Sequence, residues 1–221
     1  MLYYILGGFA FGLLIPYMAR RFAKFMPATP AYALWQLIKP VKNIKGIRKQ
    51  KLQKAYYWRS LMSGLLTAGL TYIFVRHFET ANPGWCVFYL WILLLLAEID
   101  WRMFLLPDIL TIPLLIGGFA FSTLGAGWVI GAESALGAVA GYMLPVLASI
   151  LMLRKSKDAF GGGDIKFLAA IGAWIGVLPL VYVIATASIL MFGYMLVLRQ
   201  KSAAFGPALS IAAIIVALLF F

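Results

Sequence analysis

Two aspartates in this chain stand where ionisable groups are rare. The stretch AFGGGDIKF, residues 159–167, lies between two long apolar runs and places three glycines directly before Asp164. Asp100 ends another apolar run, 64 residues earlier. Two carboxyl groups that share a site do not readily both ionise, so one holds a proton while the other is charged. Such a pair can activate water and protonate a leaving group, which is general acid–base hydrolysis without a covalent intermediate.

The chain offers little for other hydrolytic mechanisms. Its single histidine, His77, is expected on the membrane face opposite both aspartates, so no serine–histidine or cysteine–histidine pair is available beside them. Cys86 is the only cysteine, which excludes an internal disulfide and a cysteine-cluster metal site. Metal-assisted hydrolysis has poor support without histidine ligands, and we predict no metal site.

Asp164 also has a plainer interpretation. A glycine-rich turn followed by an aspartate is typical of a helix start, with the carboxylate accepting backbone N–H bonds as an N-cap. In the functional interpretation, Gly161, Gly162 and Gly163 form a loop that lets a substrate strand approach the carboxylate closely. The spacing does not match a phosphate-binding loop.

The neighbouring charges leave similar alternatives open. Asp100 is suited either to catalysis or to an ion pair with Arg102, or its carboxylate reaches the membrane interface. Asp108 follows a proline and is expected to be an N-cap. Lys166 either tunes Asp164 or extends to the interface, and we favour the second role. Lys166, Asp108 and Arg102 are therefore candidate supporting residues.

The composition defines the class of protein that must position these groups. The 221 residues are 64% hydrophobic, with a mean hydropathy of +0.95. A soluble domain of this size cannot bury so much apolar surface, so we predict an all-α, polytopic integral membrane protein. The net charge of +12 has a topological explanation, because cytoplasmic loops of membrane proteins collect Lys and Arg. We therefore predict no nucleic-acid partner.

About eight apolar segments have near-spanning length. They cover residues 2–19, 60–77, 84–100, 109–125, 128–153, 166–178, 179–198 and 204–221. The sixth is short and is expected to be half of a broken helix near Pro179. The first begins without a basic region or a small-residue cleavage site, so we expect a retained span and not a signal peptide.

The basic residues orient these spans. Residues 20–59 hold eleven Lys and Arg and no acid, and we place this loop in the cytoplasm. Alternation of the spans then leaves 18 of the 19 basic residues on the cytoplasmic side, with Arg76 as the exception. The N-terminus is predicted outside. Asp100 and Asp164 both fall at the cytoplasmic edge, where helix packing can bring them together.

Several motifs resemble those of a known family, the type IV prepilin leader peptidases. The glycines and Asp164 match the G-x-G-D pattern of the GxGD aspartyl proteases. The first aspartate motif of the family resembles residues 99–114, IDWRMFLLPDILTIPL, in which Asp108 follows Asp100 by eight positions. Its F-G-P segment resembles residues 203–213, AAFGPALSIAA, and its first span loosely resembles residues 7–21, GGFAFGLLIPYMARR. By motif, the catalytic aspartates of the family correspond to Asp100 and Asp164, and Asp108 to a non-catalytic position.

The resemblance implies a bacterial inner-membrane peptidase with its active site at the cytoplasmic face. Such enzymes remove the short basic leader of prepilins and pseudopilins of type IV pilus and type II secretion systems, usually after a glycine. Many then methylate the new N-terminal residue with S-adenosylmethionine. Two parts are expected: residues 1–59, a first transmembrane helix with a basic loop that is a reduced equivalent of the methyltransferase region, and residues 60–221, a transmembrane aspartyl peptidase domain.

The chain departs from the family in its first part. The usual member carries two C-x-x-C pairs there, which look like a zinc site, whereas residues 20–59 contain no cysteine. The resemblance is therefore to a secretion-type member that lacks the zinc cysteines. We predict no zinc, no cofactor for proteolysis, and S-adenosylmethionine only where methylation is retained. The basic loop is suited to contact anionic membrane lipids.

Two other functions remain as alternatives. The first is a small proton-coupled membrane transporter that uses Asp100 and Asp164 as relay groups. It predicts inverted repeats and carboxylates near mid-membrane, and no self-similarity between the halves is evident. The second is a structural membrane subunit that anchors other proteins through its basic loop. That hypothesis leaves the glycines beside Asp164 unexplained.

Overall fold

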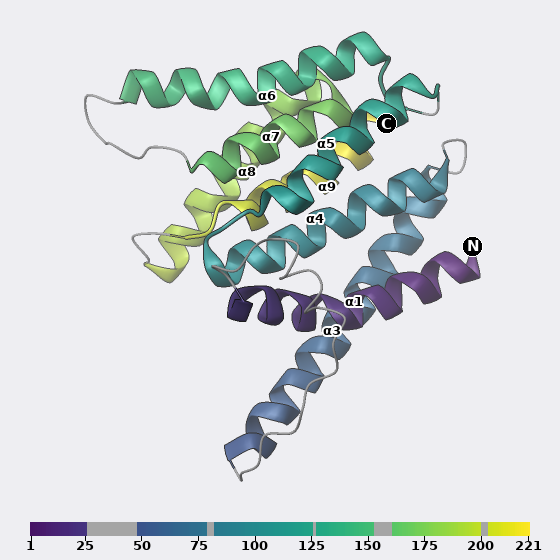
Figure 1. The fold of residues 1–221 in the computed structure, drawn as a ribbon, viewed down its shortest axis with the longest axis vertical. Coiled ribbons are helices and arrows are strands. Elements are labelled where there is room, and N and C mark those ends of the chain that lie inside the picture. The colour runs from purple at the N-terminus through teal and green to yellow at the C-terminus, as the bar shows by residue number, and fades with distance from the viewer. Residues whose placement is uncertain (26–47, 79–81, 126, 153–160, 200–202) are drawn as a thin grey trace.

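The computed structural model describes residues 1–25, 48–78, 82–125, 127–152, 161–199 and 203–221, and over these ranges the chain is all-helical (Figure 1). The prediction of an all-α protein is confirmed. The eight helices of the described ranges are α1 (Leu2–Phe25), α3 (Arg48–His77), α4 (Pro83–Met103), α5 (Asp108–Thr123), α6 (Gly131–Met152), α7 (Gly162–Ile175), α8 (Val177–Leu198) and α9 (Gly206–Phe220).

Four of the described helices are long and apolar enough to cross a membrane. These candidate spans are Leu2–Phe22, Pro83–Met103, Gly131–Ile150 and Val177–Leu198. Two further helices, α5 and α9, are apolar but shorter. Several spans connected in one chain make this a multi-pass membrane protein.

Two helices differ from the predicted segments at their starts. α3 begins at Arg48, twelve residues before the predicted span, and runs without a break through residues 59 and 60, where we divided the chain. α7 begins at Gly162 and not at residue 166, so two of the three glycines are helical. Most of the predicted basic loop, residues 26–47, lies outside the described residues.

The break between the sixth and seventh segments is at Gly176 and not at Pro179. Gly176 has φ of +77°, a backbone conformation that glycine adopts without steric cost. Pro179 instead lies in the first turn of α8, where a proline is tolerated because its missing N–H would have no helical partner. The prediction that the sixth segment is half of a broken helix is wrong, because α7 is a helix of its own and the chain reverses direction at Gly176 to form α8 (Figure 1).

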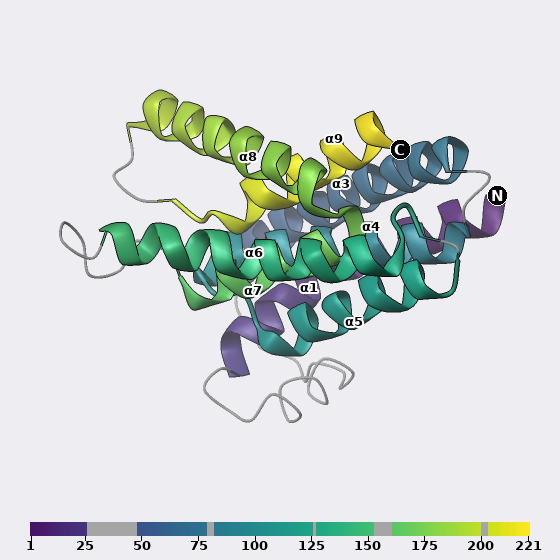
Figure 2. The same ribbon diagram turned by 90° about the horizontal axis from the view of Figure 1, so that it is seen from above.

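α7 is the central helix of the bundle. Its residues from Phe167 to Ile175 are all buried, and it packs against α5, α6, α8 and α9. Seen from above, α5 and α8 lie on either side of it (Figure 2). A Cβ atom on Gly137 of α6 would overlap the Gly172 carbonyl of α7, so glycine lets the two backbones touch.

The C-terminus of α4 and the N-termini of α7 and α9 lie together at one end of the bundle (Figure 1). α4 packs against α1, α3, α5 and α9, and so connects the first part of the chain to the last. This arrangement places Asp100, in the last turn of α4, near the first turns of α7 and α9. The chain termini, Met1 and Phe221, lie at the opposite end.

Candidate active site

Asp100 is buried and held by the N-terminus of α9. The residue is only 4% exposed, and its carboxylate oxygen Oδ2 accepts a hydrogen bond from the backbone N–H of Gly206 at 2.8 Å. The first N–H groups of a helix have no partner within the helix and carry a partial positive charge. The start of α9 therefore satisfies a buried carboxylate that comes 106 residues earlier in the chain.

The local sequence at Gly206 makes this contact possible. A Cβ atom built there would lie 2.7 Å from the Asp100 oxygen, so any side chain would collide with the carboxylate. Pro207 follows within the first turn of α9, where it costs no hydrogen bond. Gly206 is a site residue to which our sequence analysis gave no role. The F-G-P segment was the signal that pointed to it.

Asp164 is half-buried and is held by its own helix. Gly161 is the N-cap of α7, and Asp164 lies three residues later, in the first turn. Its carboxylate accepts a hydrogen bond from the backbone N–H of Gly161, as an acidic residue does at this position of a capping box. The alternative in which Asp164 is itself the N-cap does not hold, because α7 starts earlier than predicted and its N-cap is Gly161.

Both carboxyl groups line one cavity of about 420 Å³. The other lining residues are the three glycines before Asp164, the segment that joins α4 to α5, and a charged pair at the rim: Phe104, Leu105, Leu106, Asp108, Gly161, Gly162, Gly163 and Lys166. The structure thus brings together the two aspartates that the sequence analysis singled out.

The glycines differ in what surrounds them. A Cβ atom on Gly163 would lie 3.0 Å from the Leu106 side chain and 3.3 Å from its carbonyl oxygen. A Cβ atom on Gly162 would meet no atom of the described residues within 4 Å. Gly163 therefore allows α7 to pack against the segment after α4, whereas Gly162 leaves open space beside Asp164.

Asp108 and Lys166 form an ion pair at the rim of the cavity. Lys166 Nζ lies 2.6 Å from Asp108 Oδ2, and the two side chains are about half exposed. The expectation that Asp108 is an N-cap is wrong, because Pro107 is the N-cap of α5. Lys166 neither contacts Asp164 nor simply extends to the interface, because it joins α7 to α5.

Arg102 does not pair with Asp100. Its guanidinium lies 2.6 Å from Glu98 on the same helix, and Arg59 of α3 lies 3.0 Å from the other Glu98 oxygen. Glu98 and Arg102 are four residues apart, the spacing at which opposite charges meet on a helix. Asp100 is turned away from both arginines, toward α9, and is left with a neutral backbone donor.

The chemistry of the cavity rests on its carboxyl groups. Among the described residues, those that line it include no serine, threonine, cysteine or histidine, and so supply no hydroxyl, thiol or imidazole nucleophile. Two carboxyl groups from different helices can hold a water molecule between a base and an acid. This arrangement suits hydrolysis by direct attack of water.

Comparison with known proteins shows the family. The profile of the type IV leader peptidase family matches residues 87–196, a range that contains both aspartates. The chain is 35% identical to a prepilin leader peptidase/N-methyltransferase of Escherichia coli (strain K12), over 74% of this chain and 76% of that protein. It is 32% identical to the protein of the same name from Dichelobacter nodosus, over 87% of this chain and 71% of that protein. The chain belongs to the type IV leader peptidase family.

A longer relative shows how much of the family's length is present. The chain is 39% identical to a prepilin leader peptidase/N-methyltransferase of Aeromonas salmonicida (strain A449), over 76% of this chain. The match covers 60% of that relative. No solved structure matches the chain significantly.

Proposed function

We propose that this protein is a leader peptidase that cuts the basic leader from prepilins or pseudopilins, after a glycine. Family membership supports the substrate class, since the relatives are named prepilin leader peptidases. The observation that carries the proposal is the cavity lined by Asp100 and Asp164. The two aspartates are 64 residues apart in sequence and come from different helices, α4 and α7, that meet at one end of the bundle.

The proposed mechanism uses the two aspartates as a base and an acid. The ionised carboxylate takes a proton from a water molecule as the water oxygen attacks the scissile carbonyl carbon. The protonated carboxyl group gives its proton to the amide nitrogen as the C–N bond breaks. The leader leaves with a new carboxylate, and the mature chain leaves with a new amine. The space beside Gly162 admits the extended segment that contains the scissile bond.

The proposal includes a membrane topology. The eight described helices cross or enter the bacterial inner membrane, with the N-terminus outside, the basic start of α3 (residues 48–59) in the cytoplasm and the cavity at the cytoplasmic face. The distribution of Lys and Arg supports this orientation. Both aspartates lie in end turns of helices and not at mid-helix, whereas a proton-coupled transporter would place its relay groups near the midplane.

Methylation of the new N-terminus is proposed only from the names of the relatives, which include N-methyltransferase. S-adenosylmethionine would supply the methyl group. We assign no residue to this step. Zinc is not part of the proposal, because Cys86 is the only cysteine and is buried in α4, where it cannot form a four-cysteine site.

An intact-mass assay tests the proposal. Purified protein in detergent is mixed with a prepilin substrate, with and without S-adenosylmethionine, and the assay is repeated with Asp100→Asn and Asp164→Asn. We expect the wild type to release the leader and each variant to be slower by about 10²- to 10⁴-fold, the usual contribution of a general acid or base. Each asparagine keeps an oxygen for the Gly206 or Gly161 N–H, so both variants should fold.

An added methyl mass would show that methylation is retained without zinc. An uncut substrate with the wild type, or normal cleavage by both variants, would falsify the two-aspartate mechanism.

A further inference from the structure

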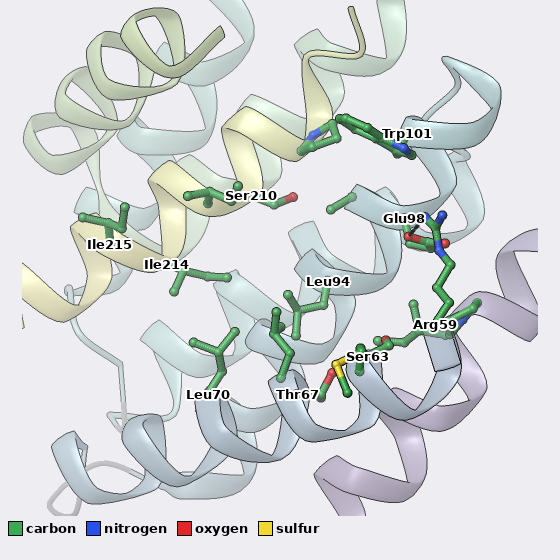
Figure 3. Close-up of a pocket in the computed structure, with 17 residues that line it drawn as sticks. Arg59, Ser63, Thr67, Leu70, Leu94, Glu98, Trp101, Ser210, Ile214 and Ile215 are labelled. Carbon is green, nitrogen blue, oxygen red and sulfur yellow. Dashed lines mark hydrogen bonds and ion pairs between the residues drawn. The ribbon is translucent and has the colours of Figure 1, made fainter. Parts of the chain in front are cut away.

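A second cavity lies on the other side of α4 from the aspartates. It has a volume of about 540 Å³ and forms a groove between α3 and α9, with α4 as its floor and α1 at one end (Figure 3). Most of its lining is aliphatic, including Leu66, Leu70, Leu94, Ile211, Ile214 and Ile215. Leu66, Ile211 and Ile215 are 56%, 50% and 41% exposed, so nothing in the described chain covers them.

The groove has a length that suits a helix. Its lining runs from Arg59 to Leu70 on α3 and from Pro207 to Ile215 on α9. At 1.5 Å per residue these stretches are about 12–16 Å long, which is two to three helical turns. A rod-shaped apolar segment can therefore lie along α4, with one face in the groove and the other toward lipid.

One end of the groove is polar and adjoins the candidate active site. Glu98 and Arg59 form an ion pair there, beside Trp101 (Figure 3). Trp101 directly follows Asp100 in α4, and Pro207 directly follows Gly206, which binds the Asp100 carboxylate. The groove therefore ends next to the Asp100–Gly206 contact on both α4 and α9. A bound segment that leaves the groove at this end passes close to that contact.

We propose that this groove binds the apolar helix of the substrate, the part that follows the cleavage site. The inference rests on the proposed peptidase function and adds to it the place where the substrate is held. The charges fit such a substrate. The cavity beyond the groove contains Asp100 and Asp164 besides the Asp108–Lys166 ion pair, so its lining is acidic overall and complements a basic leader, while the groove itself complements an apolar helix.

A membrane lipid is the competing occupant. A phospholipid would place its phosphate at the polar end, where it needs a free cation. Arg59 and Arg102 are both already bound to Glu98. Within the described part of the chain, the groove therefore offers a phosphate only cations whose charge is partly neutralised, and this favours the peptide helix.

Filling the groove tests the proposal. Leu66→Trp on α3 and Ile211→Trp on α9 add bulk from its two walls, at exposed positions where the fold tolerates a larger side chain. Ile189→Trp is the matched control, because Ile189 is 70% exposed on α8 and does not line the groove. Each variant is given two substrates: a full-length prepilin, and a leader peptide that ends a few residues after the cleavage site.

We expect both groove variants to raise KM for the full-length substrate about tenfold with kcat unchanged, as loss of uniform binding does. The short peptide, which lacks the helix, should be cut at the wild-type rate, and the Ile189→Trp control should match the wild type with both substrates. A photo-crosslinking residue at position 215 should attach to the apolar segment of the substrate, whereas the same residue at position 189 should not.

Three results would overturn the inference. The first is an unchanged KM for the full-length substrate in both groove variants. The second is an equal loss for the two substrates, which would mean that the added bulk disturbed the active site. The third is a phospholipid that stays crosslinked at position 215 in the presence of substrate, which would assign the groove to lipid. None of these results affects the peptidase proposal, which fails only if the wild-type protein leaves prepilin uncut or if the aspartate variants cut it normally.

Discussion

Asp100 and Asp164 face the same cavity but are held in opposite ways. Asp100 is 4% exposed, and its hydrogen-bond donor belongs to a helix 106 residues further along the chain. Asp164 is half-buried, and its donor, Gly161, is three residues away in the same turn. One carboxylate is fixed by tertiary packing and the other by local helix geometry.

This difference shows where the site is vulnerable. The position of Asp164 depends on the first turn of α7, which forms wherever that helix forms. The position of Asp100 depends on the docking of α9 against α4. Substitutions on α9 are therefore expected to displace Asp100, because no residue close to it in sequence holds its carboxylate. The predictions below examine this contrast.

The largest effect is expected from Gly206→Ala. The new methyl group would lie 2.7 Å from Asp100 Oδ2, so the carboxylate or α9 must move. A displacement of about 1 Å in a catalytic group can lower the rate by about 10²-fold. Overpacking of this kind costs about 1–3 kcal/mol of stability. Cleavage rates and the thermal unfolding midpoint measure the two effects.

Gly193→Ala is the matched control for this prediction. Gly193 lies within α8, and a Cβ atom there would meet nothing within 4 Å. It should leave activity unchanged and stabilise its helix by about 0.5–1 kcal/mol. Equal behaviour of the two alanine variants would contradict the role given to Gly206.

Alanine substitution of each aspartate separates the two supports directly. Asp100→Ala leaves the Gly206 N–H buried without an acceptor, which costs about 1–3 kcal/mol. Asp164→Ala should cost less, because Gly161 is exposed and its N–H can bind water. Chemical unfolding in detergent compares the two variants, and a larger loss with Asp164→Ala would reverse the comparison.

The glycines before Asp164 should respond differently to alanine. Gly163→Ala pushes against Leu106 and should lower stability, while Gly162→Ala meets no atom of the described residues and should raise stability by up to about 1 kcal/mol. Gly162→Ala also puts a methyl group where the substrate is proposed to approach, so its KM should increase. A stable Gly162→Ala enzyme with a wild-type KM would show that substrate does not pass there.

The smallest effect is expected from Lys166→Ala. The ion pair with Asp108 is about half exposed on both sides, and pairs of this kind contribute about 0–1 kcal/mol. Activity should remain within a factor of about two, since Lys166 contacts neither Asp100 nor Asp164 and an exposed ion pair is weak. A matching result with Asp108→Asn would place the pair at the rim of the site and outside its chemistry. A large rate loss in either variant would assign this pair a part in substrate binding.

The helices could be predicted from hydropathy. The distribution of basic residues then predicted that the two aspartates lie at the same end of the bundle. Alternation of spans is a strong constraint, because each added helix reverses the direction of the chain. The pairing of Glu98 with Arg102 was also accessible, from their spacing on one helix. The early start of α7 was harder to predict, since a run of three glycines favours a loop over a helix.

The Asp100–Gly206 contact could not be derived from sequence periodicity. It depends on how α4 and α9 dock, and therefore on side-chain packing between segments far apart in the chain. The same limit applies to the pair between Asp108 and Lys166, which joins α5 to α7. In both cases the residue types were visible in the sequence, but their partners were set by tertiary structure.

The dependence of Asp100 on α9 has a consequence for biosynthesis. A ribosome makes Asp100 long before it makes Gly206, and the membrane receives α4 while α9 does not yet exist. During that interval the carboxylate lacks its donor, and the acid–base pair is incomplete. If the proposed mechanism holds, the newly made protein acquires its acid–base pair only after its last described helix has been inserted and docked.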